Sequence, residues 1–171
     1  VEFNNVKTIS SGNISVNVLD KIDLSKFEKK RKEIVEGKEN IYIIDTNVFV
    51  HCPNIIGKIG HKYKIVVPAK VLEELDKLKL TESIDKKALS DAARNINIAF
   101  TKHFSKMEDA DVSLLPVGFD KKNPDCQILS VALKYKGENP IVLTSDNILQ
   151  TRANGLGITT ISLSDFLKQL R

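Results

Sequence analysis

The stretch IYIIDTN, residues 41–47, decides the fold because a short apolar run ends there in an aspartate. Four similar apolar runs follow, at residues 65–67, 112–115, 141–143 and 158–161. Stretches with helical spacing lie between them, at residues 71–80, 88–104, 125–135, 147–153 and 165–170. Strands that alternate with helices are typical of a parallel sheet covered on both faces. We therefore expect an α/β protein, a three-layer α/β/α sandwich around a mostly parallel, five-stranded sheet.

The bulk composition fits one domain with a small appendage. The chain has 171 residues, of which 42% are hydrophobic and 28% charged. No apolar run is long enough to cross a membrane, and the N-terminus lacks a signal pattern. The only cysteines, Cys52 and Cys126, have no ligand spacing, so we expect neither a disulfide framework nor structural zinc, but a reducing cytoplasm. A net charge of +4 is compatible with a polyanionic partner.

The first 40 residues differ from the rest of the chain. Alternating apolar residues at 14–18 follow a turn-like stretch and predict a small hairpin. The charged stretch 26–38 predicts an exposed helix that ends near Gly37. We therefore expect an N-terminal appendage at residues 1–40 and a second, larger domain at 41–171.

Two aspartates follow predicted strands. Asp45 comes after the first apolar run, and Asp146 comes after the fourth. Aspartate also caps helices, so either residue alone allows a purely structural interpretation. Adjacent strands lie only about 5 Å apart, and sites of parallel sheets form at the carboxyl ends of strands. Two such aspartates in one sheet therefore favour a shared site.

Two further stretches can add carboxylates to this site. In the helix predicted at 71–80, Glu73 points away from the apolar stripe, whereas Glu74 and Asp76 lie on its two borders and stay equal candidates. Asn123 and Pro124 are typical of a helix start and place the next residue, Asp125, in a first turn. The helix dipole alone favours an aspartate there. Its predicted face points inward, however, so its carboxylate needs a partner, which a metal ion would supply.

A cluster of carboxylates suits a hard divalent cation. Mg²⁺ and Mn²⁺ prefer oxygen ligands, whereas acids crowded together without a cation repel one another. A bound ion can activate water for in-line attack on a phosphodiester and stabilise charge on the leaving oxygen. The acidic pattern therefore predicts metal-dependent phosphodiester hydrolysis.

Four ordered motifs carry a resemblance to a known family: IYIIDTNVFVHCPN (41–54), VVPAKVLEELDKLK (66–79), NPDCQILSVAL (123–133) and IVLTSDNILQTRANGLGI (141–158). Together they resemble a PIN domain over residues 41–170, most closely the PIN domains that precede PhoH-type ATPase domains. The resemblance implies an acidic site at Asp45, Glu74, Asp125 and Asp146, and so prefers Glu74 over Asp76. It also implies that Asn47 and Thr144 support the acids by hydrogen bonds.

The resemblance further implies a Mg²⁺- or Mn²⁺-dependent endoribonuclease that cuts single-stranded RNA, with strands in the order 3-2-1-4-5. An ATPase domain of the same full-length chain, a second copy in a homodimer or an inhibitory protein are the implied partners. Two alternatives stay open: a catalytically silent module that binds RNA or protein, and a DNA-directed nuclease. A haloacid-type phosphatase is disfavoured, because its Asp-x-Asp motif is absent after Asp45.

RNA that approaches four acids needs cations to hold its phosphates. The candidates are Lys70, Lys77, Lys79, Lys86, Lys87, Arg94 and Arg152. Arg94 and Arg152 are preferred for RNA binding, since a guanidinium offers planar, bidentate donors, and Lys77 and Lys79 follow. The three histidines are scattered along the sequence, and a lone histidine is more often surface or core than ligand.

Overall fold

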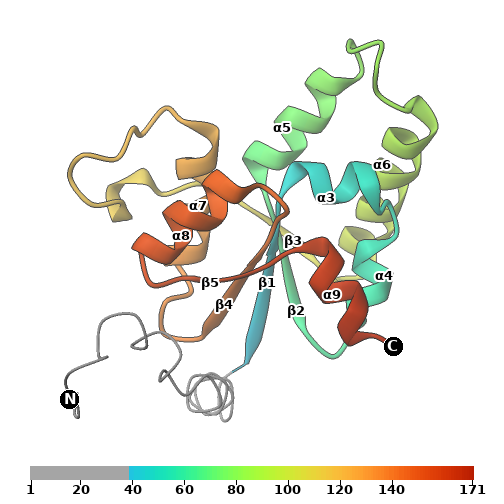
Figure 1. Cartoon of the computed structure of the whole chain (residues 1–171). Coiled ribbons are helices and arrows are strands. Elements are labelled where there is room, and N and C mark those ends of the chain that lie inside the picture. The colour runs from blue at the N-terminus through green and yellow to red at the C-terminus, as the bar shows by residue number, and fades with distance from the viewer. Residues whose placement is uncertain (1–38) are drawn as a thin grey trace, which may run out of the picture. The chain divides into compact units, whose positions relative to one another are not determined.

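The computed structural model describes residues 39–171, and the predicted hairpin and charged helix lie outside these residues. A five-stranded sheet forms the centre of the described part (Figure 1). Its strands are β1 (Asn40–Ile44), β2 (Lys64–Pro68), β3 (Lys106–Glu108), β4 (Asn139–Leu143) and β5 (Thr159–Ile161). They lie in the order β3-β2-β1-β4-β5, and every neighbouring pair is parallel. The α/β class and the strand order are both confirmed.

Helices cover both faces of this sheet. The α-helices are α3 (Thr46–His51), α4 (Ile55–Ile59), α5 (Ala69–Leu78), α6 (Lys86–Thr101), α7 (Pro124–Leu133), α8 (Asn147–Gly155) and α9 (Leu163–Gln169). Figure 1 shows α3, α4 and α9 on one side of the sheet and α7 and α8 on the other. The sheet is therefore the middle of three layers. Within residues 39–171, no helix has the length and apolar character needed to cross a membrane.

The central strands are continuous apolar runs because both of their faces are covered. In β1, Ile41, Ile43 and Ile44 are fully buried. The strand pairs in register with both neighbours, so Ile43 lies beside Val66 of β2 and Val142 of β4. This double pairing fixes where β1 ends, and with it the position of the residue that follows.

The third strand is not where the apolar runs predict it. The expected strand at 112–115 is wrong: Val112–Leu114 is a 3₁₀ helix, whose preceding Asp111 accepts a hydrogen bond from the backbone N–H of Ser113 at 3.2 Å. The strand is instead Lys106–Glu108, at the edge of the sheet, with Lys106 and Met107 exposed. An edge strand of three residues needs no apolar run, which explains why the sequence pattern did not reveal it.

Candidate metal centre

The ends of β1 and β4 bring two predicted acids to the same edge of the sheet. Ile44 and Leu143, the last residues of the two strands, are register partners. Beyond them, the backbone N–H of Asp45 donates to the carbonyl oxygen of Leu143 at 3.0 Å. Asp146 follows Leu143 by three residues. Both aspartates therefore stand at the carboxyl edge of the sheet, where the alternation of strands and helices predicts a site.

Asp45 is a buried carboxylate whose side chain is held on both oxygens. Its residue is 6% exposed. Oδ1 accepts from the backbone N–H of Thr46 at 2.7 Å, and Oδ2 accepts from the hydroxyl of Thr144 at 2.7 Å. Burial raises its pKa to about 6; these hydrogen bonds lower the pKa, whereas the nearby charges of Asp125 and Glu74 raise it. An added cation would relieve this cost of burying charge.

Asp146 both caps a helix and faces the site. Its Oδ1 accepts from the backbone N–H of Ile148 at 2.8 Å and of Leu149 at 3.2 Å, in the first turn of α8. The hydroxyl of Thr144 accepts from the backbone N–H of Asp146 at 3.0 Å. Thr144 therefore links both strand-end aspartates. Capping and membership of a shared site are not exclusive, since one carboxylate does both.

Helix α5 separates the acids that the helical pattern left equal. The Oε1 atom of Glu74 accepts from the hydroxyl of Thr46 at 2.7 Å, which ties α5 to the residue directly after Asp45. Asp76 points outward, with a side chain 73% exposed and paired with Lys79 at 2.9 Å. Glu73 is also exposed and pairs with Lys70 and Lys77. Geometry therefore places Glu74, and neither neighbouring acid, beside Asp45.

Asp125 points inward, as its predicted face requires, and its partner is an arginine. Asn123 caps α7, and its Oδ1 accepts from the backbone N–H of Asp125 at 2.9 Å. Nη1 of Arg152 lies 3.3 Å from Asp125 Oδ2 and 3.3 Å from Asn123 Oδ1. Burial raises the pKa of Asp125. The negative charges of Asp146 and Glu74 raise this pKa further, whereas the positive charge of Arg152 lowers it. The arginine contact and the metal ion expected from the sequence are compatible, because a carboxylate has a second oxygen, Oδ1, for which no arginine contact is found among residues 39–171.

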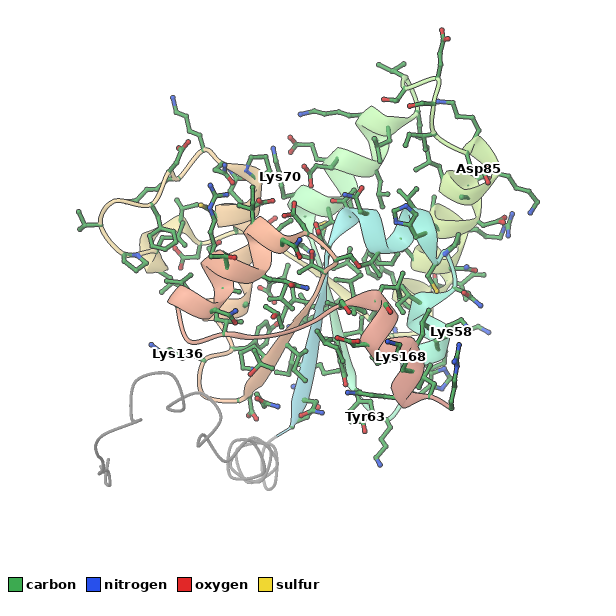
Figure 2. The ribbon with its side chains drawn as sticks, in the orientation of Figure 1. Lys58, Tyr63, Lys70, Asp85, Lys136 and Lys168 are labelled. Atoms are coloured by element: carbon green, nitrogen blue, oxygen red, sulfur yellow. The ribbon has the colours of Figure 1, made fainter. Side chains whose placement is uncertain are left out.

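The four acids line one cleft of about 330 Å³, which we call the acidic cleft. Its other lining residues are Thr46, Asn47, Lys70, Lys77, Leu78 and Pro124. Figure 2 labels Lys70, which belongs to the first turn of α5, at the carboxyl edge of the sheet. The site thus combines four carboxylates and two lysines. Two of the carboxylates follow strands β1 and β4, and the other two belong to helices α5 and α7.

The donor set fits a hydrated hard cation better than a closed metal cage. Within residues 39–171, no three His, Cys, Asp or Glu side chains stand close enough to hold one ion directly. Mg²⁺ usually keeps several waters and uses only one or two carboxylates together with substrate phosphate oxygens. The side chains of the acidic cleft that can ligate a metal all do so through oxygen, and the cleft has space for such waters.

The other predicted residues divide between the acidic cleft and the outer surface. Asn47 and Lys77 line the cleft, and Thr144 is fully buried beneath it. Arg94, on α6, pairs with Asp91 at 2.9 Å and does not line the cleft, nor does Lys79. Thr46 is a supporting residue that the sequence pattern misses, although its place between Asp45 and Asn47 is a signal that points to it.

Comparisons with solved structures find other chains with a similar fold. One is a domain of a functionally unknown protein from Methanocaldococcus jannaschii, 25% identical, with a TM-score of 0.52 over 72% of this chain and 90% of that one. A PilT N-terminus domain protein from Sulfolobus solfataricus is 16% identical, with a TM-score of 0.51 over 76% and 92%. The PIN domain of human SMG5 is 16% identical, with a TM-score of 0.50 over 77% and 99%.

A family model supplies the assignment that these structures alone do not. No curated protein sequence matches the chain significantly. The family model described as PIN domain matches residues 42–164, which include the end of β1, all of β4 and every acid of the cleft. PIN domains are generally nucleases and usually use divalent metals. On this match, the chain belongs to the PIN domain family and has a nuclease-type fold.

Proposed function

We propose that the chain is a divalent-metal-dependent endoribonuclease that hydrolyses phosphodiester bonds of single-stranded RNA in the acidic cleft. One observation carries this proposal: Asp45, Glu74, Asp125 and Asp146, which are far apart in sequence, line a single cleft at the carboxyl edge of the sheet. Burial and mutual repulsion raise the pKa of Asp45 and Asp125 there, so the cleft gains from a bound cation.

The residues of the cleft have separate tasks in this proposal. Asp45 and Asp146 are the best fixed carboxylates, since hydrogen bonds hold each of them. Glu74 and Asp125 complete the oxygen donor set, and Thr46 and Thr144 orient Glu74 and Asp45. When bound, Mg²⁺ or Mn²⁺ supplies Lewis acidity and lowers the pKa of the attacking water.

Cations at the cleft support a polyanionic substrate. Lys70 and Lys77 line it beside the acids, and Arg152 borders it through Asp125. Phosphate contacts supply most of the affinity for nucleic acid. The choice of RNA, a closer relation to PhoH-associated PIN domains, an ATPase, second-copy or inhibitory partner and a cytoplasmic setting are further parts of the proposal, inherited from the sequence resemblance.

The test is cleavage of labelled single-stranded RNA and DNA in Mn²⁺, Mg²⁺ or EDTA. We expect metal-dependent cutting of RNA by the wild type. Asp45→Asn and Asp146→Asn should each reduce cutting by at least about 100-fold, since even residues that only support a metal ligand are worth about 10–100-fold. Asp165→Asn is the matched control, because Asp165 is an exposed acid on α9 outside the cleft.

Cutting that survives both cleft substitutions would exclude the acidic cleft as the catalytic site. RNA binding without metal-dependent cutting would instead favour the silent module. Preference for DNA over RNA would keep the mechanism and change the substrate class. Cleavage in Mn²⁺ or Mg²⁺ but not in EDTA would show that the metal ion is required. No cleavage under any of the three conditions would show that the chain lacks the activity.

A further inference from the structure

A second hollow, of about 500 Å³, lies at the amino ends of the strands, on the side of the sheet opposite the acidic cleft. The proposed function does not use it. It lies at the amino ends of β2 and β3, whereas the acidic cleft lies at carboxyl ends. Its lining includes Glu39, Tyr63, Ile65 and Ser105, together with the residues that carry the argument: His61, Lys62, Lys64, His103, Phe104 and Lys106. We call this the basic hollow.

The charge of the basic hollow is positive. Three lysines, Lys62, Lys64 and Lys106, line it against one acid, Glu39. Glu39 lies 3.6 Å from Lys64, in an ion pair whose two side chains are each about half exposed. Lys62 has no salt bridge among the described residues and stands over the Tyr63 ring, with Nζ 5.6 Å from its centroid. The hollow thus offers cations to a phosphate chain.

An exposed ring stack stands beside these lysines. The rings of His61 and Phe104 lie 3.7 Å apart between centroids, with planes 21° apart. Phe104 is partly buried against the core, whereas His61 is exposed. Within residues 39–171, the imidazole is therefore accessible to another flat ring. A stacking surface beside lysines is the usual arrangement for binding single-stranded nucleic acid.

We propose that the basic hollow binds a single-stranded segment of RNA, with phosphates on Lys62 and Lys64 and one base stacked on His61. The segment must be single-stranded, because a base inside a duplex already has both of its faces covered. The choice of RNA rests on the proposed function, but binding here requires neither metal nor cleavage.

A purely structural origin explains only part of this arrangement. The hollow lies just after the C-terminal ends of α4 and α6, where helix dipoles favour cations. That effect accounts for lysines and histidines at this edge. It does not account for a ring stack with an open face, nor for lysines around a concave surface. An acidic protein segment would use the charges but leave the stack unused.

The experiment measures binding of a fluorescent 12-nucleotide RNA to the whole chain in EDTA, by anisotropy across a range of salt concentrations. Lys62→Ala/Lys64→Ala removes two phosphate contacts. We expect affinity to fall by about ten-fold or more at 0.1 M salt, and the slope of log affinity against log salt to fall by about 1.4. Lys136→Ala/Lys168→Ala is the matched control, since both lysines are exposed and line neither the acidic cleft nor the basic hollow.

The stacking part has its own pair of variants. His61→Ala should weaken RNA binding by at least about five-fold, which is the low end for one lost base stack. His61→Phe should keep most of the affinity, because it keeps a flat ring on Phe104.

Equal losses in the two double-lysine variants, or unchanged binding in His61→Ala, would overturn the proposal. Poly-glutamate that competes as strongly as RNA would also overturn it, in favour of an acidic protein partner. Failure here leaves the cleavage assay unaffected, since binding is measured without metal. Loss of cleavage with binding intact would count against the proposed function alone.

Discussion

The two edges of the sheet carry opposite charge on one small fold. At the carboxyl edge, four acids line a cleft of about 330 Å³. At the amino edge, three lysines and two histidines line a hollow of about 500 Å³. The side chains of the two sets also differ in their surroundings. Asp45 is buried and hydrogen-bonded on both oxygens, whereas His61 and Lys62 are exposed.

The direction of the helices explains part of this difference. In a parallel α/β fold, helix N-termini follow the carboxyl ends of strands, and an N-terminus carries about half a positive charge. Asp45, Asp125 and Asp146 each cap a helix or lie in its first turn. The sign of charge at each edge is therefore weak evidence for function. Features that the dipole does not explain carry more weight, and Glu74 is one of them.

The largest expected effect separates two acids of α5. Glu74 and Asp76 both lie well inside the helix, beyond the reach of its N-terminal dipole. Only Glu74 lines the acidic cleft. Glu74→Gln should lower kcat/KM for RNA by about 100–1000-fold, a loss typical of removing one charge-stabilising group. Asp76→Asn should stay within about two-fold of wild type. Equal losses from both would break the distinction between cleft and surface acids.

The next effect concerns the stability of the metal-free protein. The pKa of Asp45 rises from 3.8 to about 6 on folding. The folded state therefore holds the proton more tightly, so the free energy of unfolding falls as pH rises from about 4 to 6 and is flat above. The difference is at most about 3 kcal/mol, from about two pKa units. Urea unfolding in EDTA at pH 4 and pH 7 measures it.

Two variants sharpen this pH measurement. Asp45→Asn should flatten the fall in stability, because the amide does not titrate. Lys62→Ala/Lys64→Ala, at the opposite edge, should keep the wild-type slope. Since Asp125 shifts in the same direction, the decisive quantity is the difference in slope between wild type and Asp45→Asn. Identical slopes of unfolding free energy against pH in the two proteins would show that burial does not raise the pKa of Asp45.

The sequence could predict those parts of the fold and site that burial marks directly. The central strands β1 and β4 are buried on both faces, so each appears as an uninterrupted apolar run. The end of such a run locates a strand end, and hence Asp45 and Asp146. The position of Asp125 is predicted by the helix start at Asn123 and Pro124, and the helical wheel places its side chain on the inward face. The strand order was inherited from the family resemblance rather than from the pattern.

The remaining features depend on contacts between distant segments. The edge strand β3 is mostly exposed and has no apolar run. The helical wheel could not choose Glu74 over Asp76, because the choice depends on Thr46, 28 residues away. His61 and His103 looked scattered, yet the turns after α4 and α6 bring them to one hollow. Composition and residue spacing do not show which distant segments come into contact in the folded chain.

The smallest effect compares two arginines that the sequence treated alike. Arg152 contacts Asp125 and Asn123 from α8, whereas Arg94 pairs with Asp91 on the outer face of α6. Arg152→Ala should lower kcat/KM by about ten-fold, as expected for a group that positions a ligand. Arg152→Lys should recover part of the loss, because it keeps the charge without the planar donors. Steady-state cleavage of RNA measures both variants.

Arg94→Ala is the control, and its kcat/KM should stay within about two-fold of wild type. A loss at Arg94 equal to that at Arg152 would mean that RNA extends along α6, beyond the acidic cleft. The pH profile separates the roles further. Because Arg152 lowers the pKa of Asp125, its removal should move the acidic limb of the cleavage profile to higher pH. Arg94→Ala should leave that limb in place, since Arg94 contacts Asp91 and no acid of the cleft.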